Sequence, residues 1–192
     1  MVNKLNEQHE NIFDIYICNL IDSQLHIYKQ LGLTPNMVTT LSLISGISSA
    51  YMIHKKNYKI AGILFFIAYY FDCVDGKLAR KYNMISKIGD YYDHFSDIVK
   101  FVIVMYVLYK DNNIRFKNIV IIIILLVILC LYHLGCQQGI YSDSSKPSES
   151  PTLDVFKPSK HSSSINIHNT KYFGCGTLYI ILSLIIFFWD SL

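Results

Sequence analysis

Apolar residues are concentrated in five stretches of the chain, and polar or charged residues separate them. The stretches cover residues 38–53, 60–71, 101–109, 119–134 and 173–189. A helix needs about 20 residues to cross the hydrocarbon core of a bilayer. The second and third stretches are too short alone, so their helices must run on towards Lys81 and begin near Asp93, respectively. The pattern predicts five transmembrane helices, two of which carry acidic residues within the membrane.

Two further regions contain more polar residues, one before the first predicted helix and one between the fourth and the fifth. Residues 11–32, NIFDIYICNLIDSQLHIYKQLG, interleave apolar and charged positions, which is typical of an amphipathic helix lying on the membrane surface. Residues 141–171 are rich in serine and contain prolines, which indicates a polar loop. We therefore expect an all-α, polytopic integral membrane bundle over residues 1–192. It would be a single domain with an interfacial segment at 1–34 and a polar loop at 141–171.

Composition supports the membrane assignment and excludes other classes. The chain is 52% hydrophobic and 16% charged, whereas soluble domains are roughly a quarter charged. A net charge of +3 without a basic stripe argues against nucleic-acid binding. The five cysteines lack C-x-x-C spacing and are expected to be small buried side chains. Lysine and arginine are more numerous on the side of the membrane that would hold the acidic residues, which favours a cytoplasmic location for that side.

Four aspartates stand out because ionised carboxylates are costly at membrane depth unless a cation is close. At about 100° per residue, Asp72 and Asp75 share one face of their helix, and Asp93 and Asp97 share a stripe on the next. A short turn near residues 82–86 would make the two acidic faces meet. We therefore expect the four carboxylates to converge.

Convergent carboxylates suit hard divalent cations such as Mg²⁺ or Mn²⁺. Two such ions about 4 Å apart are a recurrent arrangement for displacement at phosphorus. Small residues on the same faces, Gly76, Ala79 and Gly89, would leave room for a ligand, and Arg80 could clamp a phosphate. The sequence thus predicts a site with two Mg²⁺ or Mn²⁺ ions next to a phosphate pocket.

The spacing of these residues resembles the signature of the CDP-alcohol phosphotransferase family. The pattern is Asp72-x-x-Asp75-Gly76-x-x-Ala79-Arg80, then eight residues, then Gly89-x-x-x-Asp93-x-x-x-Asp97. Upstream, LTPNMVTTLSLISG resembles the Pro-Asn-x-x-Thr start of the family's first transmembrane helix. Together the two stretches cover about a fifth of the chain.

The resemblance implies a multi-pass membrane enzyme of phospholipid synthesis that transfers a substituted phosphate from a CDP-linked donor to an alcohol acceptor and releases CMP. Asp72, Asp75 and Asp93 would hold two metal ions on the donor diphosphate. Asp97 would be the general base and a further metal ligand. The nucleotide and phosphate pocket would be formed by Gly76, Ala79, Arg80, Gly89 and Asn36.

Several alternatives remain at this stage. The leading hypothesis is transfer of phosphocholine or phosphoethanolamine to diacylglycerol, because Asp93-His94 resembles the aminoalcohol branch of the family. The second is phosphatidyl transfer from CDP-diacylglycerol to inositol, serine or glycerol phosphate. From another class, a cation transporter or an inactive scaffold built on a buried ion-pair network would also use clustered aspartates.

The remaining expectations concern neighbouring residues and assembly. Asp90 lies outside the motif, and His94 is expected to face away from the acidic stripe in a packing role. Lys100 is expected to pair with Asp97 or to reach the interface, which is a structural role. Family members typically have six spans and often form homodimers, whereas this sequence shows five spans.

Overall fold

The fold is a bundle of helices, as the hydropathy pattern predicts. The computed structural model describes residues 9–141 and 166–192, which contain helices and no strands. The α-helices are α1 (Ile12–Gln30), α2 (Pro35–His54), α3 (Tyr58–Lys81), α4 (Lys87–Asp111), α5 (Asn113–Tyr141) and α7 (Cys175–Phe187), with 3₁₀ turns η3 (Lys171–Phe173) and η4 (Trp189–Ser191). One helix lies at each of the five predicted apolar stretches. The prediction of an all-α membrane bundle is confirmed.

Helices α2 and α4 each begin where a side chain accepts a hydrogen bond from a backbone amide of the first turn. Thr34 caps α2 by accepting a hydrogen bond from the Met37 amide, and Pro35 is the first helical residue, as the sequence predicts. Ser86 caps α4 by accepting from the Gly89 amide at 3.0 Å. The connection between α3 and α4 is therefore the short turn expected at residues 82–86.

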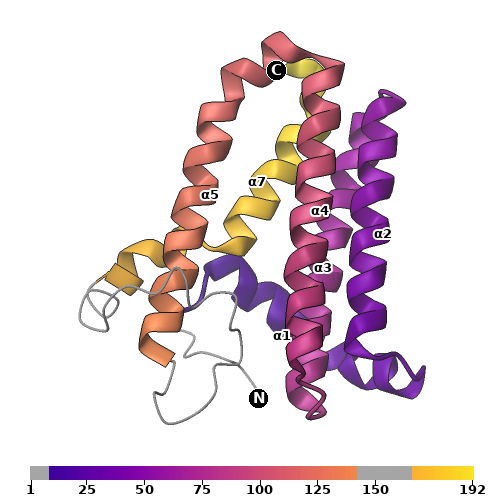
Figure 1. Cartoon of the computed structure of the whole chain (residues 1–192), viewed down its shortest axis with the longest axis vertical. Coiled ribbons are helices and arrows are strands. Elements are labelled where there is room, and N and C mark those ends of the chain that lie inside the picture. The colour runs from indigo at the N-terminus through magenta and orange to yellow at the C-terminus, as the bar shows by residue number, and fades with distance from the viewer. Residues whose placement is uncertain (1–8, 142–165) are drawn as a thin grey trace.

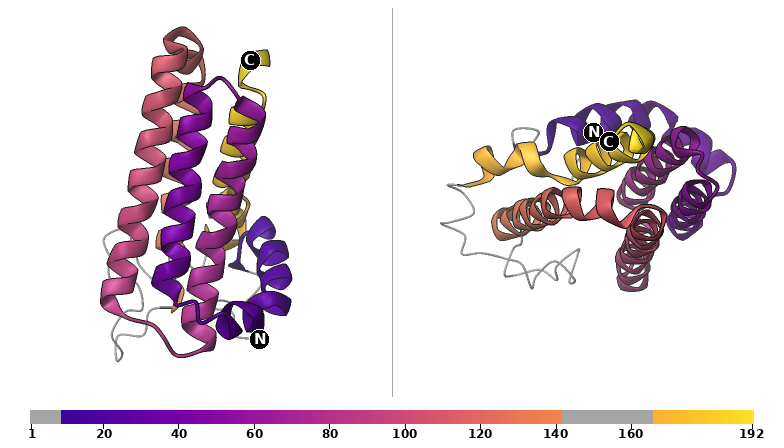
Figure 2. Two further views of the ribbon diagram at one scale, coloured as in Figure 1. Left: turned by 90° about the vertical axis from the view of Figure 1, so that its right-hand side faces the viewer. Right: turned by 90° about the horizontal axis from the view of Figure 1, so that it is seen from above.

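Helices α2, α3 and α4 lie together at one side of the bundle, and α2 packs against both of the others (Figures 1 and 2). Small polar residues on α2 allow close contact with α3. The Ser42 hydroxyl donates to the Ala68 carbonyl and the Ser49 hydroxyl to the Ala61 carbonyl, each at 2.8 Å. These bonds satisfy buried hydroxyls and hold the two helix backbones together. Both helices that carry the acidic residues, α3 and α4, thus pack against α2.

Helix α1 packs against the C-terminal half of α3. Its buried face includes Ile21 and Leu25, and the opposite face exposes Tyr16 and Leu20. The Lys77 ammonium on α3 is 2% exposed, lies 2.7 Å from Asp22 and donates to the Cys18 carbonyl at 2.8 Å. One apolar face of the amphipathic helix α1 is therefore buried against the rest of the bundle. The location of the other face at a membrane surface stays a prediction, and residues 1–8 of the interfacial segment lie outside the described part of the chain.

Helix α5 exposes much of its apolar surface. Ile121, Ile124 and Ile128 are each more than half exposed. By length and composition, two stretches of the described residues could cross a membrane, Asn113–Ile140 and Asn166–Phe187. The exposed apolar surface of α5 is suited to lipid contact.

The polar-loop prediction at 141–171 is wrong at its C-terminal end. Residues 142–165 lie outside the described part of the chain, but 166–170 are helical and lead into η3. Ile167 is 1% exposed, and the Thr170 hydroxyl lies 3.1 Å from His133 Nδ1 on α5. These tertiary contacts stabilise a helix that the local composition did not predict.

Helices α3 and α7 approach each other closely at Gly62. A Cβ atom added at Gly62 would lie 2.7 Å from the Ser183 carbonyl oxygen and 2.9 Å from the Phe187 backbone nitrogen. Since backbone atoms cannot move as a flexible side chain can, Gly62→Ala should force the helices apart at a cost of about 1–3 kcal/mol. Thermal unfolding in detergent should show a melting temperature lower by several degrees, at roughly 2–4 °C per kcal/mol.

Gly76→Ala is the matched control for this stability measurement. Its added Cβ would meet the end of the Arg80 side chain at 3.2 Å, and that side chain can shift. Equal melting temperatures for the Gly62→Ala and Gly76→Ala proteins would contradict the proposed close packing of α3 on α7.

Candidate active site

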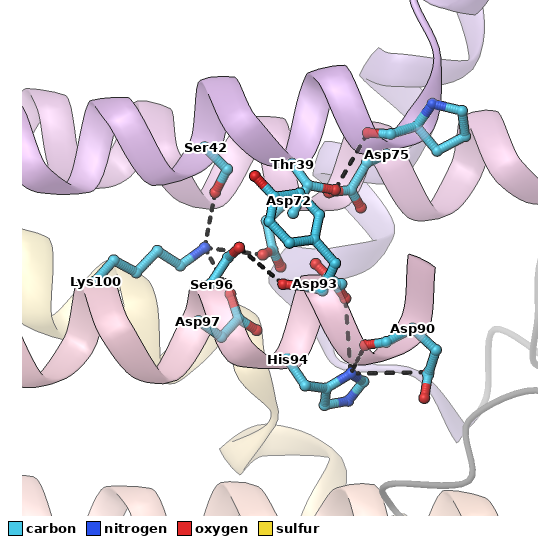
Figure 3. A network of polar contacts seen from close by, with 12 residues as sticks. Thr39, Ser42, Asp72, Asp75, Asp90, Asp93, His94, Ser96, Asp97 and Lys100 are labelled. Carbon is cyan, nitrogen blue, oxygen red and sulfur yellow. Dashed lines mark hydrogen bonds and ion pairs between the residues drawn. The ribbon is translucent and has the colours of Figure 1, made fainter. Parts of the chain in front are cut away.

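The structure brings three of the four predicted metal ligands into one cluster. Asp72 comes from α3, and Asp93 and Asp97 come from α4. One carboxylate oxygen from each of the three lies within 4.8 Å of the others. Figure 3 shows these side chains meeting between the helices, with Asp75 close by. The expected convergence of the two acidic faces is present.

Asp75 is the most deeply buried of the four acids, at 4% exposure. Its Oδ2 atom accepts a hydrogen bond of 2.6 Å from the Thr39 hydroxyl of α2 (Figure 3). Thr39 also donates to the Pro35 carbonyl at 3.2 Å, so the hydroxyl is shared between its own helix and the acid. Thr39 is the threonine of the Pro-Asn-x-x-Thr stretch. That stretch therefore supports the acidic cluster directly as well as starting a helix.

Lys100 enters the cluster from α4 and is completely buried. Its ammonium lies 2.6 Å from Asp97 Oδ1 and 2.9 Å from Asp72 Oδ1, and it donates to the Ser42 hydroxyl at 2.8 Å. The expected pairing with Asp97 is present. The second bond, to Asp72 on the neighbouring helix, was not expected from the sequence, because only tertiary packing brings residues 72 and 100 together.

His94 lies closer to the acids than the sequence suggested. Its Nδ1 atom is 2.9 Å from the Asp90 carbonyl oxygen, 3.7 Å from Asp90 Oδ1 and 3.9 Å from Asp93 Oδ2 (Figure 3). The expectation that His94 faces away is wrong, because the helix rotation places it at the edge of the cluster. The Asp90 side chain is only 9% exposed, so it belongs to the same polar network.

A cavity of about 280 Å³ opens next to the acidic cluster. Its wall contains Asp72, Asp75, Asp93 and every residue predicted for the nucleotide and phosphate pocket, namely Asn36, Gly76, Ala79, Arg80 and Gly89. His94 and Asp90 also line it. The residues of the sequence pattern thus share one concave surface.

Asp97 is the predicted site residue that does not line this cavity. Besides Lys100, its Oδ1 atom accepts a hydrogen bond of 3.4 Å from the Tyr179 hydroxyl of α7. About a third of its side chain is exposed. The Asp97 carboxylate therefore belongs to the acidic cluster without forming part of the cavity wall.

Two glycines shape the wall of the cavity. A Cβ at Gly76 would press on the Arg80 guanidinium at 3.2 Å, and a Cβ at Gly89 would lie 2.9 Å from the Ser86 hydroxyl and 3.2 Å from the Asn36 amide oxygen. The absence of side chains at both positions lets Arg80 and Asn36 lie along the wall. Their placement agrees with a pocket for a large polar ligand.

Two acids at the start of the described chain, Glu10 just before α1 and Asp14 in its first turn, also line the same cavity, which the sequence motif did not indicate. Both share the cavity wall with Tyr69, Cys18, Cys73 and Cys175. The Tyr69 hydroxyl donates a short hydrogen bond to Asp14. Burial raises the pKa of Asp14 to about 6, although the bond from Tyr69 acts in the opposite direction. In the sequence, the acidic residues of this N-terminal region follow the pattern of an ordinary amphipathic helix. Only the tertiary structure shows that some of them line the cavity.

The chemistry of the donor set fits a hard divalent ion. Asp72, Asp93 and Asp97 offer carboxylate oxygens, which Mg²⁺ and Mn²⁺ prefer, and the cluster contains no thiolate. Asp75 lies next to these three residues, and the hydrogen bond from Thr39 is to its Oδ2 atom and not to its Oδ1 atom. The described residues could thus hold metal ions at the wall of the cavity.

Comparison with known proteins yields one family and a few relatives. The model of the family CDP-alcohol phosphatidyltransferase matches residues 32–150, more than half of the chain. Archaetidylinositol phosphate synthase from Pyrococcus horikoshii is 33% identical over 67 residues, which are 35% of this chain and 36% of that protein. Ethanolaminephosphotransferase 1 from Pongo abelii and from Homo sapiens is 36% identical over 73 residues, 36% of this chain and 18% of each relative.

The similarity to these curated relatives is partial. The aligned stretch spans little more than a third of the archaeal protein and less than a fifth of the other two. No solved structure matches the chain.

Proposed function

Because the chain belongs to the CDP-alcohol phosphatidyltransferase family, we propose that it transfers a substituted phosphate from a CDP-linked donor to an alcohol acceptor and releases CMP. One observation carries this proposal. The carboxylate oxygens of Asp72, Asp93 and Asp97 lie within 4.8 Å of one another beside a cavity lined by the rest of the motif. A cation pathway or a scaffold would not require the glycines and the arginine in that wall.

Within this proposal, the donor lies in the cavity. Arg80 would bind its phosphates, since a guanidinium offers several donors to phosphate oxygens. Asn36 and the open faces of Gly76, Ala79 and Gly89 would accommodate the nucleotide. Asp72, Asp75, Asp93 and Asp97 would hold two Mg²⁺ or Mn²⁺ ions. When bound, such ions neutralise phosphate oxygens and stabilise the attacking and leaving oxygens.

Asp97 is the proposed general base. It belongs to the acidic cluster yet does not line the cavity, so the acceptor hydroxyl would lie next to Asp97 while the donor occupies the cavity. As the acceptor oxygen bonds to phosphorus and the bond from phosphorus to the CMP oxygen breaks, Asp97 would take the hydroxyl proton. The absence of Asp97 from the cavity wall, which contains the other three acids, supports this division of roles.

The preferred substrates are a CDP-linked aminoalcohol and diacylglycerol. The similarity to relatives named ethanolaminephosphotransferase 1 and the Asp93-His94 pair support this choice. The second candidate is phosphatidyl transfer from CDP-diacylglycerol to a polar alcohol, which the similarity to a relative named archaetidylinositol phosphate synthase supports. We also propose a multi-pass arrangement with the active site facing the cytoplasm and assembly as a homodimer.

The test is CMP release by the purified protein with a panel of donors and acceptors in the presence of Mg²⁺ or Mn²⁺. We expect release with CDP-ethanolamine or CDP-choline and diacylglycerol. Release with CDP-diacylglycerol and a polar alcohol instead would favour the second candidate. No release with any pair, from protein that still binds Mn²⁺, would support the transporter or scaffold alternatives.

A further inference from the structure

Lys100 is unusual because its charged end is completely buried inside the proposed metal site. A lysine ammonium has three hydrogen-bond donors. Here they meet three acceptors, Ser42 Oγ at 2.8 Å, Asp72 Oδ1 at 2.9 Å and Asp97 Oδ1 at 2.6 Å (Figure 3). The ammonium is therefore fully satisfied without water, and it joins α2, α3 and α4 at one point.

The surroundings of Lys100 are shaped to its side chain. A Cβ atom at Gly46 of α2 would lie 2.7 Å from Lys100 Cβ and 3.4 Å from its Cδ, so the absence of a side chain at Gly46 provides the space for Lys100. The ring of Tyr179 on α7 lies 5.4 Å from the ammonium, within the range of a cation–π contact. Neighbours on two helices thus hold the lysine stem in place.

The Lys100 ammonium contacts one oxygen of each carboxylate, the Oδ1 atoms of Asp72 and Asp97. Each carboxylate has a second oxygen that can bind another cation. The lysine can therefore stay in place when a divalent ion binds, and it can offset part of the acidic charge when none is bound.

We propose that Lys100 is a built-in counter-charge that holds Asp72 and Asp97 together across α3 and α4 in the absence of metal, and so positions them for metal binding. This inference rests on the proposed metal-dependent function. Removing one partner of a buried charge network leaves uncompensated charge, which is strongly destabilising. A divalent ion should replace much of the missing positive charge. The stability of a Lys100 variant should therefore depend on metal far more than that of the wild type.

The experiment measures melting temperatures in detergent with EDTA and with Mn²⁺, and Mn²⁺ binding by electron paramagnetic resonance. In EDTA, Lys100→Met should melt on the order of 10 °C below the wild type. Mn²⁺ should recover at least about half of that loss. Lys77→Met is the matched control, because Lys77 is also buried and paired, with Asp22, but does not line the cavity. The decrease in melting temperature of Lys77→Met relative to the wild type should be the same with and without Mn²⁺.

A double variant keeps the test decisive if Lys100→Met does not fold in EDTA. Lys100→Met/Asp97→Asn removes one positive and one negative charge, so it should be more stable in EDTA than Lys100→Met alone. If Lys100→Met binds Mn²⁺ but its melting temperature stays as far below that of the wild type as in EDTA, the inference is overturned while the proposed function is left intact. A double variant that is less stable in EDTA than Lys100→Met would also overturn the inference. Absence of Mn²⁺ binding to the wild type as well would overturn the proposed metal chemistry and the inference with it.

Discussion

Asp97→Asn should abolish turnover while leaving donor binding largely intact. The amide keeps the size of the carboxylate but cannot accept the acceptor's proton, and general base catalysis typically contributes about 10²–10⁴-fold to the rate. Because Asp97 does not line the cavity, its replacement should lower the affinity for the CDP-linked donor less than replacement of Asp72 does. Single-turnover CMP release and equilibrium binding of the CDP-linked donor would measure the two effects separately.

Asp72→Asn is the comparison for this prediction. Asp72 lines the cavity and belongs to the same acidic cluster, so its variant should lose both turnover and donor affinity. If the affinity for the donor falls equally in the two variants, the assignment of Asp97 as the base is wrong. A retained wild-type rate in Asp97→Asn would lead to the same conclusion.

Chelation of divalent ions should stop the reaction, and this is the second large effect. Without them, the acids and the donor diphosphate would bring negative charge together around one buried ammonium, Lys100. Metal ions contribute several kcal/mol of charge stabilisation at reacting phosphates, so EDTA should lower the rate by on the order of 10³-fold or more. This loss of rate would be measured as CMP release before EDTA treatment, after it, and after addition of excess Mg²⁺ or Mn²⁺.

Recovery of the rate is the control in the chelation experiment. The rate should return with Mg²⁺ or Mn²⁺ and should not return with Ca²⁺ to the same extent, since the larger ion favours more ligands and longer distances. Activity that survives EDTA would exclude the two-metal mechanism. Loss that no added ion reverses would indicate denaturation of the protein.

Local features of the sequence were sufficient to predict the long helices and the helix faces on which the acids lie. Asp72 and Asp75 are three residues apart, and Asp93 and Asp97 are four apart, so helical periodicity alone places each pair on one face. Thr34 and Pro35 marked a helix start for equally local reasons. The turn at residues 82–86 required the two helices to be neighbours. These predictions depend on interactions within a few residues of the chain.

Contacts between distant residues were not predictable in the same way. Lys100 reaches Asp72 and Ser42, and Thr39 reaches Asp75, only because the helices pack at a particular rotation and height. His94 was misplaced for the same reason, since a small rotation of α4 decides whether it borders the acids. Asp14 of α1 and Glu10, just before this helix, reach the cavity because α1 packs on α3.

The sequence by itself determined the all-α membrane class, the acidic pairs and the small residues around them, because hydropathy and helical periodicity are properties of the chain. Only the tertiary structure decided that Asp97 is absent from the cavity wall that contains the other three acids, and that Lys100 pairs with Asp72 and Asp97 inside the bundle. The physical reason is that charge compensation in a buried site depends on distances of a few ångströms between different helices, and these distances are set by packing.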